Sequence, residues 1–525
     1  MNDITGSPKI SMSRGGSSAT IWICHPPLNL LVRSVRAGLA TCLTTALHDP
    51  GVDRIVLRSA IGCFAAGADV AELRETTSRI APFSDPEPAP TLRSLVAMIR
   101  GSDKHTLAII EGFALGGGFE LALACDTRFA HANARVGLPE VKLGLLPGSG
   151  GTQMLTRLAG PLTALDLCAS GRHVSSSEAL QLGLVDAVFD DEATLERLSS
   201  QSNGKLGPRR RSWRTLKEEI NEEWVSAARL KASQCAPGFL APLNVIKSIR
   251  AAANSVEQGL AVEWTLWLEL FWHAQREGRF HEFFASRDLG RPAPGEKVAD
   301  ISLQFDDSAR DRLGITDVSV AASTEVILVT ADTEATSQTG SRPWLRIVES
   351  LEAAPWSSES GRIIFRRGSA GRAIVEVIVS DAKEMPIALG ALKCFRRSGF
   401  AAFASKTPRV SVLGVLLAGF DLAKAEIKRN APSLDIDAAL TKFGFVTPAQ
   451  MREVEPVDPT APRWASDPVI GLVVRRLDSI ARRLIQLGAV SSTEATDVVA
   501  VNALGFPAHA GGPSFALGRW KENVS

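Results

Sequence analysis

Two glutamates and a run of three glycines form the part of this sequence whose residue types and spacing best suit chemistry. The glycines are residues 116–118, Glu120 follows them closely, and Glu140 lies further along the chain. Glycine carries no side chain, so its backbone N–H group can approach a ligand closely. Two carboxyl groups beside exposed N–H groups suit acid–base catalysis next to a stabilised oxyanion. Taken alone, the stretch also fits a glycine-rich turn with two surface glutamates.

The neighbouring segments predict the elements that must position these residues. Glu120 opens an apolar run, residues 121–125, that is typical of a helix. The dipole at the start of a helix favours negative charge at the same place. Upstream, residues 56–60 predict a strand, and residues 64–69 predict a turn that leads into a helix. We therefore expect the glycines and Glu120 to lie at a helix N-terminus.

Four motifs, in this order and spacing, resemble the crotonase (enoyl-CoA hydratase/isomerase) family. They are the strand and turn at 56–69, the glycine loop at 110–120, Val136–Glu140, and Gly144–Thr152. The resemblance runs from Pro26 to Val185. It implies the α/β spiral fold of the crotonases for the first part of the chain.

The resemblance also implies a role for each matched position. The family polarises an acyl-CoA thioester with two backbone N–H groups, which correspond here to those of Ala68 and Gly117. Hydratases of the family use two glutamates, which correspond to Glu120 and Glu140. One carboxylate activates water for attack at Cβ, and the other handles the proton at Cα. Further positions expected to contact the substrate are Ala66, Gly67, Asp69, Gly116 and Gly148.

The presence of both glutamates favours an enoyl-CoA hydratase of fatty acid β-oxidation, with or without isomerisation of the double bond. Hydration of this kind needs no bound cofactor, because the substrate itself carries the coenzyme A. The expected ligand is therefore an acyl-CoA thioester.

The composition is typical of a large enzyme without nucleic-acid or membrane partners. The 525 residues suggest about three domains, and the net charge of +1 offers no electrostatic attraction for nucleic acid. The seven cysteines are scattered and show no metal-ligand spacing, which favours a reducing compartment and no metal site. We find no apolar run of the ~18 residues that a membrane span needs and no signal peptide. These features predict a cytoplasmic protein.

Composition shifts divide the chain into four predicted segments. Residues 213–290 show helical periodicity, and an aromatic stripe at 264–272 is expected to be core rather than a cofactor contact. The basic run Arg209–Arg211 is typical of a solvated linker. The predicted segments are a crotonase domain at 1–200, a helical linker at 201–298, a truncated Rossmann-like α/β remnant at 299–400, and an all-helical domain at 401–525.

The linker and the segments after it resemble multifunctional β-oxidation proteins, in which a crotonase domain is fused to a 3-hydroxyacyl-CoA dehydrogenase. A complete dinucleotide fold needs two βαβαβ halves and a Gly-x-Gly-x-x-Gly turn, and the sequence contains no such turn. Before residue 366 it predicts only two strands, at 325–329 and 362–365, with a helix at 343–351 between them.

At most positions that match the dehydrogenase site, this chain has a residue that differs from the one in the family. Glu376 matches the glutamate of the family's catalytic His–Glu pair, but Ile364 stands where the histidine should lie, and Leu413 stands near the position of a substrate-contacting asparagine. Glu376 is then interpreted as a remnant or a surface carboxylate, and NAD is not expected to bind.

The last segment resembles the duplicated helical domain of the same dehydrogenases, which mainly packs and dimerises. Residues 435–445 are echoed by residues 494–507, and His509 is expected to be a loop or packing residue. Two alternatives stay open: a complete bifunctional enzyme that oxidises its product with NAD, and a non-catalytic scaffold whose tail binds a thiolase. Either a homo-oligomer or a thiolase complex is compatible with such a tail.

Overall fold

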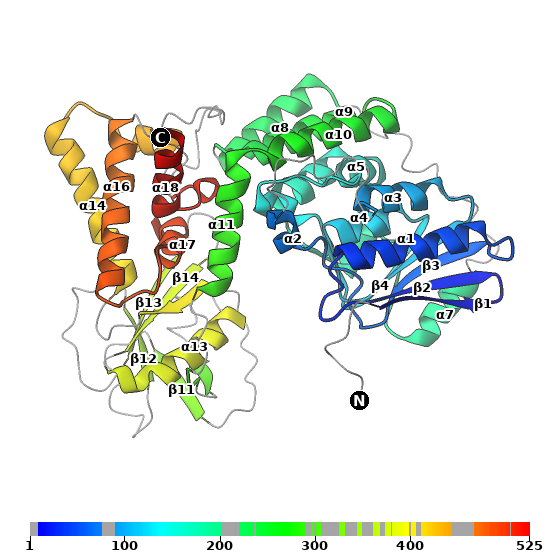
Figure 1. Cartoon of the computed structure of the whole chain (residues 1–525), viewed down its shortest axis with the longest axis horizontal. Coiled ribbons are helices and arrows are strands. Elements are labelled where there is room, and N and C mark those ends of the chain that lie inside the picture. Colours follow the sequence, from blue (N-terminus) through cyan, green and yellow to red (C-terminus); the bar gives the residue numbers. More distant parts are fainter. Residues whose placement is uncertain are drawn as a thin grey trace. The chain divides into compact units, whose positions relative to one another are not determined.

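The structure is a computed structural model, and its described residues fall into two compact units (Figure 1). The first unit contains Met1–Ala232 and Phe239–His273, and the second contains Ser233–Gly238 and Ala274–Ser525. The division into four segments is finer than this and stays a prediction. The described residues are 9–75, 90–201, 216, 220–235, 238–289, 296–298, 301–305, 325–330, 344–348, 361–367, 373–379, 381–397, 401–405, 411–443, 467–504 and 506–524.

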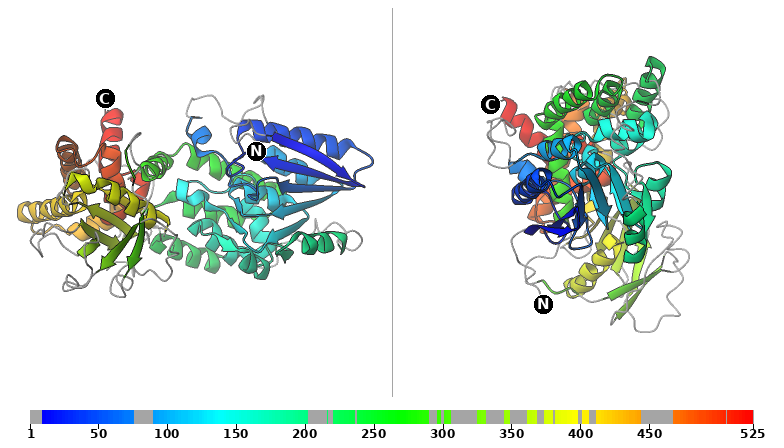
Figure 2. Two further views of the ribbon diagram at one scale, coloured as in Figure 1. Left: turned by 90° about the horizontal axis from the view of Figure 1, so that it is seen from below. Right: turned by 90° about the vertical axis from the view of Figure 1, so that its right-hand side faces the viewer.

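A six-stranded sheet forms the centre of the first unit, in the order β1-β2-β3-β4-β6-β9. Only the β1–β2 pair is antiparallel; every other neighbouring pair in this sheet is parallel. Figure 2 shows the twist of the sheet, which follows from the chirality of the strands. The strands are β1 (Lys9–Gly15), β2 (Ser18–Cys24), β3 (Arg54–Ser59), β4 (His105–Ile110), β6 (Thr127–His131) and β9 (Ala187–Phe189).

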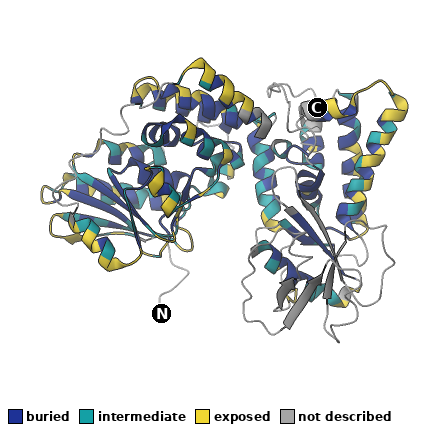
Figure 3. Cartoon of the chain, turned by 180° about the vertical axis from the view of Figure 1, so that it is seen from behind, coloured by how far each residue is buried: buried dark blue, intermediate teal, exposed yellow. Residues whose placement is uncertain are grey.

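Burial along the strands explains why they pair in this way. The side chains of β2 alternate between buried and half-buried, whereas those of β3 and β4 are buried almost throughout. Continuous burial is typical of parallel strands that are covered on both faces. Figure 3 shows these strands as mostly buried, with exposed residues on the outer surfaces of the helices.

The helices of the first unit each place an apolar stripe against other elements. In α1, for example, Val35, Leu39 and Leu43 recur at helical spacing and are buried. The helices are α1 (Arg33–His48), α2 (Val70–Glu75), α3 (Leu92–Gly101), α4 (Gly117–Ala124), α5 (Gly151–Ser170), α6 (Ser176–Gln181), α7 (Glu192–Gln201), α8 (Glu222–Cys235), α9 (Leu240–Ala251) and α10 (Val256–Phe271). A small sheet, β5-β7-β8, and the short 3-10 helix η1 complete this unit; their bounds are β5 (Phe113–Leu115), β7 (Arg135–Gly137), β8 (Val174–Ser175) and η1 (Pro139–Leu143).

The second unit has its own six-stranded sheet, in the order β10-β11-β12-β13-β14-β15. The pair β13–β14 is antiparallel and the other neighbours are parallel. The strands are β10 (Ile301–Phe305), β11 (Glu325–Thr330), β12 (Trp344–Val348), β13 (Gly361–Arg367), β14 (Ala373–Ile378) and β15 (Ala401–Ala404).

Two expectations for this sheet were wrong. The predicted helix at 343–351 is a strand over the described residues Trp344–Val348, because this segment pairs in parallel with β11 on one side and β13 on the other. The described residues between Ile301 and Arg367 form four strands, rather than the two that were predicted. The predicted strands at 325–329 and 362–365 are confirmed by β11 and β13.

Helices make up the rest of the second unit. Each member of the predicted repeat contains a helix: α15 covers Ile436–Phe443 of the first, and α17 covers the second as far as Leu504. No helix in the described parts of the chain combines the length and the apolar character needed to cross a membrane. The helical elements are α11 (Ala274–Asp288), η4 (Ala382–Glu384), α13 (Met385–Arg397), α14 (Val412–Asn430), α15 (Ile436–Phe443), α16 (Pro468–Gln486), α17 (Thr493–Leu504), η6 (Ala508–Ala510) and α18 (Pro513–Val524).

Candidate active site

Glu120 lies in the first turn of α4 and is almost completely buried, with 2% of its surface exposed. All eight residues of α4 are buried, as the apolar run after the glycines predicts. The Oε1 atom of Glu120 accepts hydrogen bonds from the N–H groups of Ser149 at 2.7 Å and Gly151 at 2.9 Å. The alternative of a surface glutamate at this position is therefore wrong.

The glycine loop is packed so closely that side chains would not fit. A Cβ atom built on Gly118 would lie 2.1 Å from the carbonyl oxygen of Ala65, far inside the normal contact distance. Gly116 has a φ of 52°, in the left-handed region that favours glycine. Its Cα faces Glu140, because a Cβ there would lie 3.0 Å from Oε1 of Glu140.

The two predicted oxyanion-hole positions lie on segments that run side by side. Ala65 donates its N–H to the carbonyl of Phe113 at 2.9 Å, and Leu115 donates to the carbonyl of Ala65 at 3.0 Å. A Cβ built on Gly67 would lie 3.7 Å from the backbone nitrogen of Gly117. This pairing brings the turn that contains Ala68 next to the start of α4. Within the described part of the chain, neither the Ala68 nor the Gly117 N–H donates a hydrogen bond.

Other predicted substrate-contact residues have structural partners in this turn. Ala66 donates its N–H to the carbonyl of Leu28, and the carbonyl of Gly67 accepts from Leu31. The Asp69 carboxylate accepts from the N–H of Ala71 at 2.9 Å, where α2 begins. These contacts orient the turn, and their roles toward a substrate stay predictions.

Glu140 lies on η1 and is half-buried, but its Oε2 atom is enclosed and has no hydrogen-bond partner among the described residues. Burial and the negative charges of Glu120 and Glu263 raise the pKa of Glu140 well above its ordinary value. Burial likewise raises the pKa of Glu120 to about 7, although the two N–H donors partly oppose the shift. The structure thus brings the two predicted glutamates into one electrostatically linked cluster.

A third buried carboxylate, which the sequence analysis did not identify, belongs to Glu263 on α10. It accepts hydrogen bonds from the N–H of Gly150 at 2.5 Å and the N–H of Thr152 at 2.9 Å. Burial and the charge of Glu120 raise its pKa to about 8. A glutamate at a core position of an otherwise apolar helix face was the available signal, since charged groups are seldom buried without partners.

The aromatic stripe of α10 packs against Gly148, just before the loop at residues 149–152. A Cβ built on Gly148 would lie 2.6 Å from Cδ1 of Trp267. Trp267 is itself stacked between Trp264 and Phe271, with ring centroids 5.0 and 4.7 Å apart. The expected core role fits these contacts, and Trp267 in addition closes one side of the Gly148 turn.

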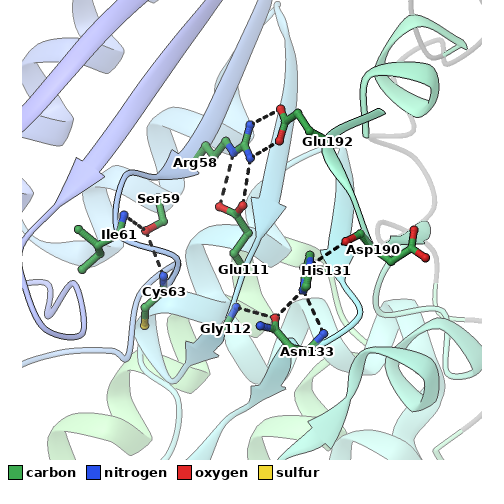
Figure 4. Close-up of polar contacts among 10 residues, drawn as sticks. All are labelled: Arg58, Ser59, Ile61, Cys63, Glu111, Gly112, His131, Asn133, Asp190 and Glu192. Carbon is green, nitrogen blue, oxygen red and sulfur yellow. Dashed lines mark hydrogen bonds and ion pairs between the residues drawn. The ribbon is translucent and has the colours of Figure 1, made fainter. Parts of the chain in front are cut away.

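A cluster of polar contacts lies at the ends of β3 and β4, before the turn that contains Ala68 (Figure 4). Arg58 on β3 pairs with Glu111 at 3.0 Å and with Glu192 at 2.7 Å. The hydroxyl of Ser59 accepts from the N–H groups of Ile61 and Cys63, at 3.0 and 3.2 Å. These bonds fix the chain where it leaves the sheet and enters the turn before Ala68.

The degenerate dehydrogenase positions also converge, in the second unit. Ile364 on β13 is the cross-strand partner of Glu376 on β14. Glu376 is fully buried, so the surface-carboxylate interpretation was wrong. Its carboxylate accepts from the N–H of Val412 at 2.7 Å, the N–H of Leu413 at 3.1 Å and the Ser411 hydroxyl at 2.7 Å. Burial raises the pKa of Glu376 to about 7.

Some predicted features lie outside the described residues. These are the linker run Arg209–Arg211 and the side chains of Ile364 and His509. Among the described residues, no group of three or more His, Cys, Asp or Glu side chains is arranged to hold a metal ion.

Comparison with known proteins places these features in a family. The sequence pattern of the enoyl-CoA hydratase/isomerase family matches residues 14–236. The peroxisomal bifunctional enzyme of Danio rerio is 40% identical over 275 residues, which cover 52% of this chain and 37% of that enzyme. The crystal structure of enoyl-CoA hydratase from Bacillus halodurans has 22% identity, covers 52% of this chain and 98% of that chain, and gives a TM-score of 0.39.

The bifunctional relatives are therefore matched over little more than a third of their own length, 37% in the first case. A probable enoyl-CoA hydratase of Bacillus subtilis is 40% identical over 184 residues, which cover 35% of this chain and 70% of that protein. This match extends over most of that relative, and the family match at residues 14–236 includes both Glu120 and Glu140. The chain belongs to the enoyl-CoA hydratase/isomerase family.

Proposed function

We propose that this chain adds water across the 2,3 double bond of enoyl-CoA thioesters, as a hydratase of fatty acid β-oxidation. The observation that carries the proposal is the arrangement of two interacting carboxylates, the buried Glu120 and the half-buried Glu140, beside the glycine loop. The backbone N–H groups of Ala68 and Gly117, which donate to no acceptor among the described residues, lie on the adjoining segments. Neither feature alone specifies the reaction, but together they supply an acid, a base and an oxyanion site.

The thioester oxygen would accept hydrogen bonds from Ala68 and Gly117. Negative charge builds up on this oxygen as water attacks Cβ, so donors that are already in place stabilise the transition state more than the substrate. Gly117 is the first residue of α4, and the helix dipole adds to this effect. Each donor of this kind contributes about 2.7–4 kcal/mol of transition-state stabilisation.

The hydrogen bonds of the two carboxylates suggest how they divide the proton transfers. Glu120 accepts two backbone N–H bonds, which favour its ionised form and suit a base. Glu140 has an enclosed oxygen that no described residue reaches with a donor, which favours its protonated form and suits an acid. Water would give a proton to Glu120 as its oxygen bonds to Cβ. The π electrons move to Cα, which takes the proton of Glu140.

Isomerisation of the double bond is a second candidate reaction at the same site. A carboxylate next to an oxyanion site can remove a proton from Cα of a 3-enoyl-CoA and return it at Cγ, without any water addition. Either Glu120 or Glu140 would serve as this carboxylate, and their electrostatic interaction supports a shared role. Conversion of a 3-enoyl-CoA to the 2-enoyl-CoA by the purified chain would test this activity.

We further propose that the second unit has no dehydrogenase activity and that no NAD is needed. Its sheet and the buried Glu376 suggest a Rossmann-like remnant, but Ile364 and Leu413 occupy positions where that chemistry needs polar side chains. Packing, self-association or binding of a thiolase are the roles that we infer for it. The predicted cytoplasmic location also stays a prediction, since the relatives include peroxisomal enzymes; cell fractionation would test it.

One assay separates the three functions considered. The purified chain is mixed with a series of enoyl-CoAs of increasing chain length, and loss of the conjugated enoyl thioester is followed with and without NAD. Hydration without NADH formation is expected. NADH formation would instead favour the bifunctional enzyme, and the absence of hydration with every substrate would favour a scaffold.

A further inference from the structure

Glu263, like Glu120, accepts hydrogen bonds from backbone N–H groups of the loop at residues 149–152. The four successive N–H groups of residues 149–152 alternate between the two carboxylates: residues 149 and 151 donate to Glu120, and residues 150 and 152 donate to Glu263. Glu263 comes from α10, far along the sequence, and only 1% of its surface is exposed. A single turn of backbone therefore determines the position of both carboxylates.

Several further contacts hold this loop in place. Gly150 has a φ of 104°, in the left-handed region, so its conformation needs support from neighbouring groups. The hydroxyl of Thr152 bonds to the Glu263 carboxylate and lies 2.6 Å from the hydroxyl of Ser248 on α9. Without Glu263, two buried N–H groups would lose their acceptors, and an unsatisfied buried donor is costly. The N–H donors that orient Glu120 depend on the same turn.

The charge of Glu263 also acts on the acid–base pair. Glu120 on α4 and Glu140 on η1 both interact electrostatically with Glu263. Among the described residues, Arg93 on α3 and the buried thiol of Cys168 on α5 also interact electrostatically with Glu263. Like charges in a buried site oppose ionisation, so an ionised Glu263 holds the proton on Glu140 more firmly.

We propose that Glu263 is a positioning residue of the hydration site, which orients Glu120 through the loop at 149–152 and helps to keep Glu140 in its proton-donating form. This inference rests on the proposed hydratase function. Glu263 does not itself exchange a proton with the substrate. Its two effects are separable, because one depends on the length of the side chain and the other depends on its charge.

The charge effect is tested by the pH profile of Glu263→Gln. Loss of the charge lets Glu140 ionise at lower pH, so the alkaline fall in kcat should move to lower pH by about one unit. The KM for the enoyl-CoA should stay near the wild-type value. Glu257→Gln is the matched control, because Glu257 is an exposed glutamate in the first turn of the same helix. The control should leave the profile unchanged.

The positioning effect is tested by Glu263→Asp, which keeps the charge but withdraws the carboxylate by one methylene. Here kcat should fall by about tenfold, as expected for a small misplacement of a reacting group, while the alkaline limb stays in place. This variant decides the question if circular dichroism shows that Glu263→Gln is not folded. Wild-type kcat in Glu263→Asp, or an unshifted limb in folded Glu263→Gln, overturns the inference alone. A wild type that hydrates no enoyl-CoA overturns the proposed function and this inference with it.

Discussion

At the residue scale, Glu120 and Glu140 are chemically alike but differ in surroundings. Glu120 has two backbone N–H donors on one oxygen, whereas Glu140 has an enclosed oxygen with no donor among the described residues. Hydrogen bonds to a carboxylate lower its pKa, and burial without them raises it. The proposed roles of base for Glu120 and acid for Glu140 therefore rest on their surroundings rather than on residue type.

Replacement of either glutamate by glutamine should lower the hydration rate by about 10²–10⁴-fold, because general acid–base catalysis typically supplies that factor. Affinity for the acyl-CoA should change little, since the backbone donors of Ala68 and Gly117 are untouched. Steady-state kinetics and calorimetry with a substrate analogue measure the two effects. Glu196→Gln on α7, an exposed position, is the control. Near-wild-type turnover in either Glu120→Gln or Glu140→Gln would contradict the proposal that both carboxylates take part in catalysis.

The pH dependence of hydration should be bell-shaped. The base form of Glu120 is present only above its pKa of about 7, so kcat should fall as the pH drops through that value. The acid form of Glu140 persists well above the ordinary pKa of a glutamate, so a second fall is expected on the alkaline side. Because the two carboxyl groups interact, the acidic and alkaline falls in kcat report pKa values of the pair rather than of either residue alone. A rate that is constant from about pH 5 to about pH 8 would contradict this arrangement.

At the element scale, the site depends on how closely α4 approaches the turn before α2. Gly118 lies against the backbone of Ala65, with no room for even a methyl group. In the second unit, Glu376 on β14 connects a strand to a helix N-terminus, because it accepts three hydrogen bonds at the start of α14. Both contacts join a helix N-terminus to an element that is distant in the sequence.

Gly118→Ala should therefore separate the two segments that carry Ala68 and Gly117. We expect a loss of about 1–3 kcal/mol in stability from overpacking, together with a marked fall in kcat because the segments that carry the two proposed N–H donors would move apart. Thermal denaturation and hydration assays measure the two effects. Gly101→Ala on α3 is the matched control, since a Cβ there meets no atom within 4 Å. Equal behaviour of the two variants would refute the close-approach argument.

Glu376→Gln should destabilise the fold by about 1–3 kcal/mol, because the amide group cannot accept all three hydrogen bonds. The pKa of Glu376 is raised to about 7, so its contribution to stability is complete below the ordinary pKa of a glutamate and declines as the pH rises through 7. The difference from wild type, measured by urea unfolding, should thus be larger at low pH. Asp437→Asn, at an exposed ion pair with Lys424, should change stability far less. A stability difference that grows with pH would contradict the assignment.

At the scale of the whole molecule, the three carboxylates of the proposed site all lie in one of the two units. Glu120, Glu140 and Glu263 all belong to the first unit, including the α10 helix that follows the predicted linker run. The second unit has a mostly parallel sheet and an apolar helical core, in which residues of α14, α16 and α17 pack together. Its buried carboxylate is occupied by helix capping, so we assign it no proton transfer.

The purified chain should neither bind NAD nor oxidise a 3-hydroxyacyl-CoA. A dinucleotide site needs a glycine-rich phosphate turn, which the sequence does not contain, and the position opposite Glu376 is Ile364 rather than a base. Titration calorimetry with NAD and a fluorescence assay for NADH test both points. Stoichiometric binding at micromolar affinity, or NADH formed from a 3-hydroxyacyl-CoA, would overturn this prediction.

Local sequence determined much of the catalytic part. The glycines at 116–118, Glu120 and the apolar run after it belong to one short segment, and their spacing alone predicted a helix N-terminus, which α4 confirms. Motifs that include Glu140 and Gly148 were recognisable for the same reason, since each combines residues that are close in sequence. Such patterns survive in a single sequence because their geometry is set by the backbone within a few residues.

Tertiary structure decided the features that depend on distant partners. Periodicity cannot distinguish a short buried strand from a helix, so Trp344–Val348 became a strand only through pairing with β11 and β13. The sequence marked Glu376 only through its resemblance to a dehydrogenase position, and it did not predict the burial of Glu263 or Glu376. They are buried because backbone N–H groups from other elements, at Gly150 and Val412 for example, provide the hydrogen bonds that a buried carboxylate requires. Those donors are supplied by the fold, and no local pattern records them.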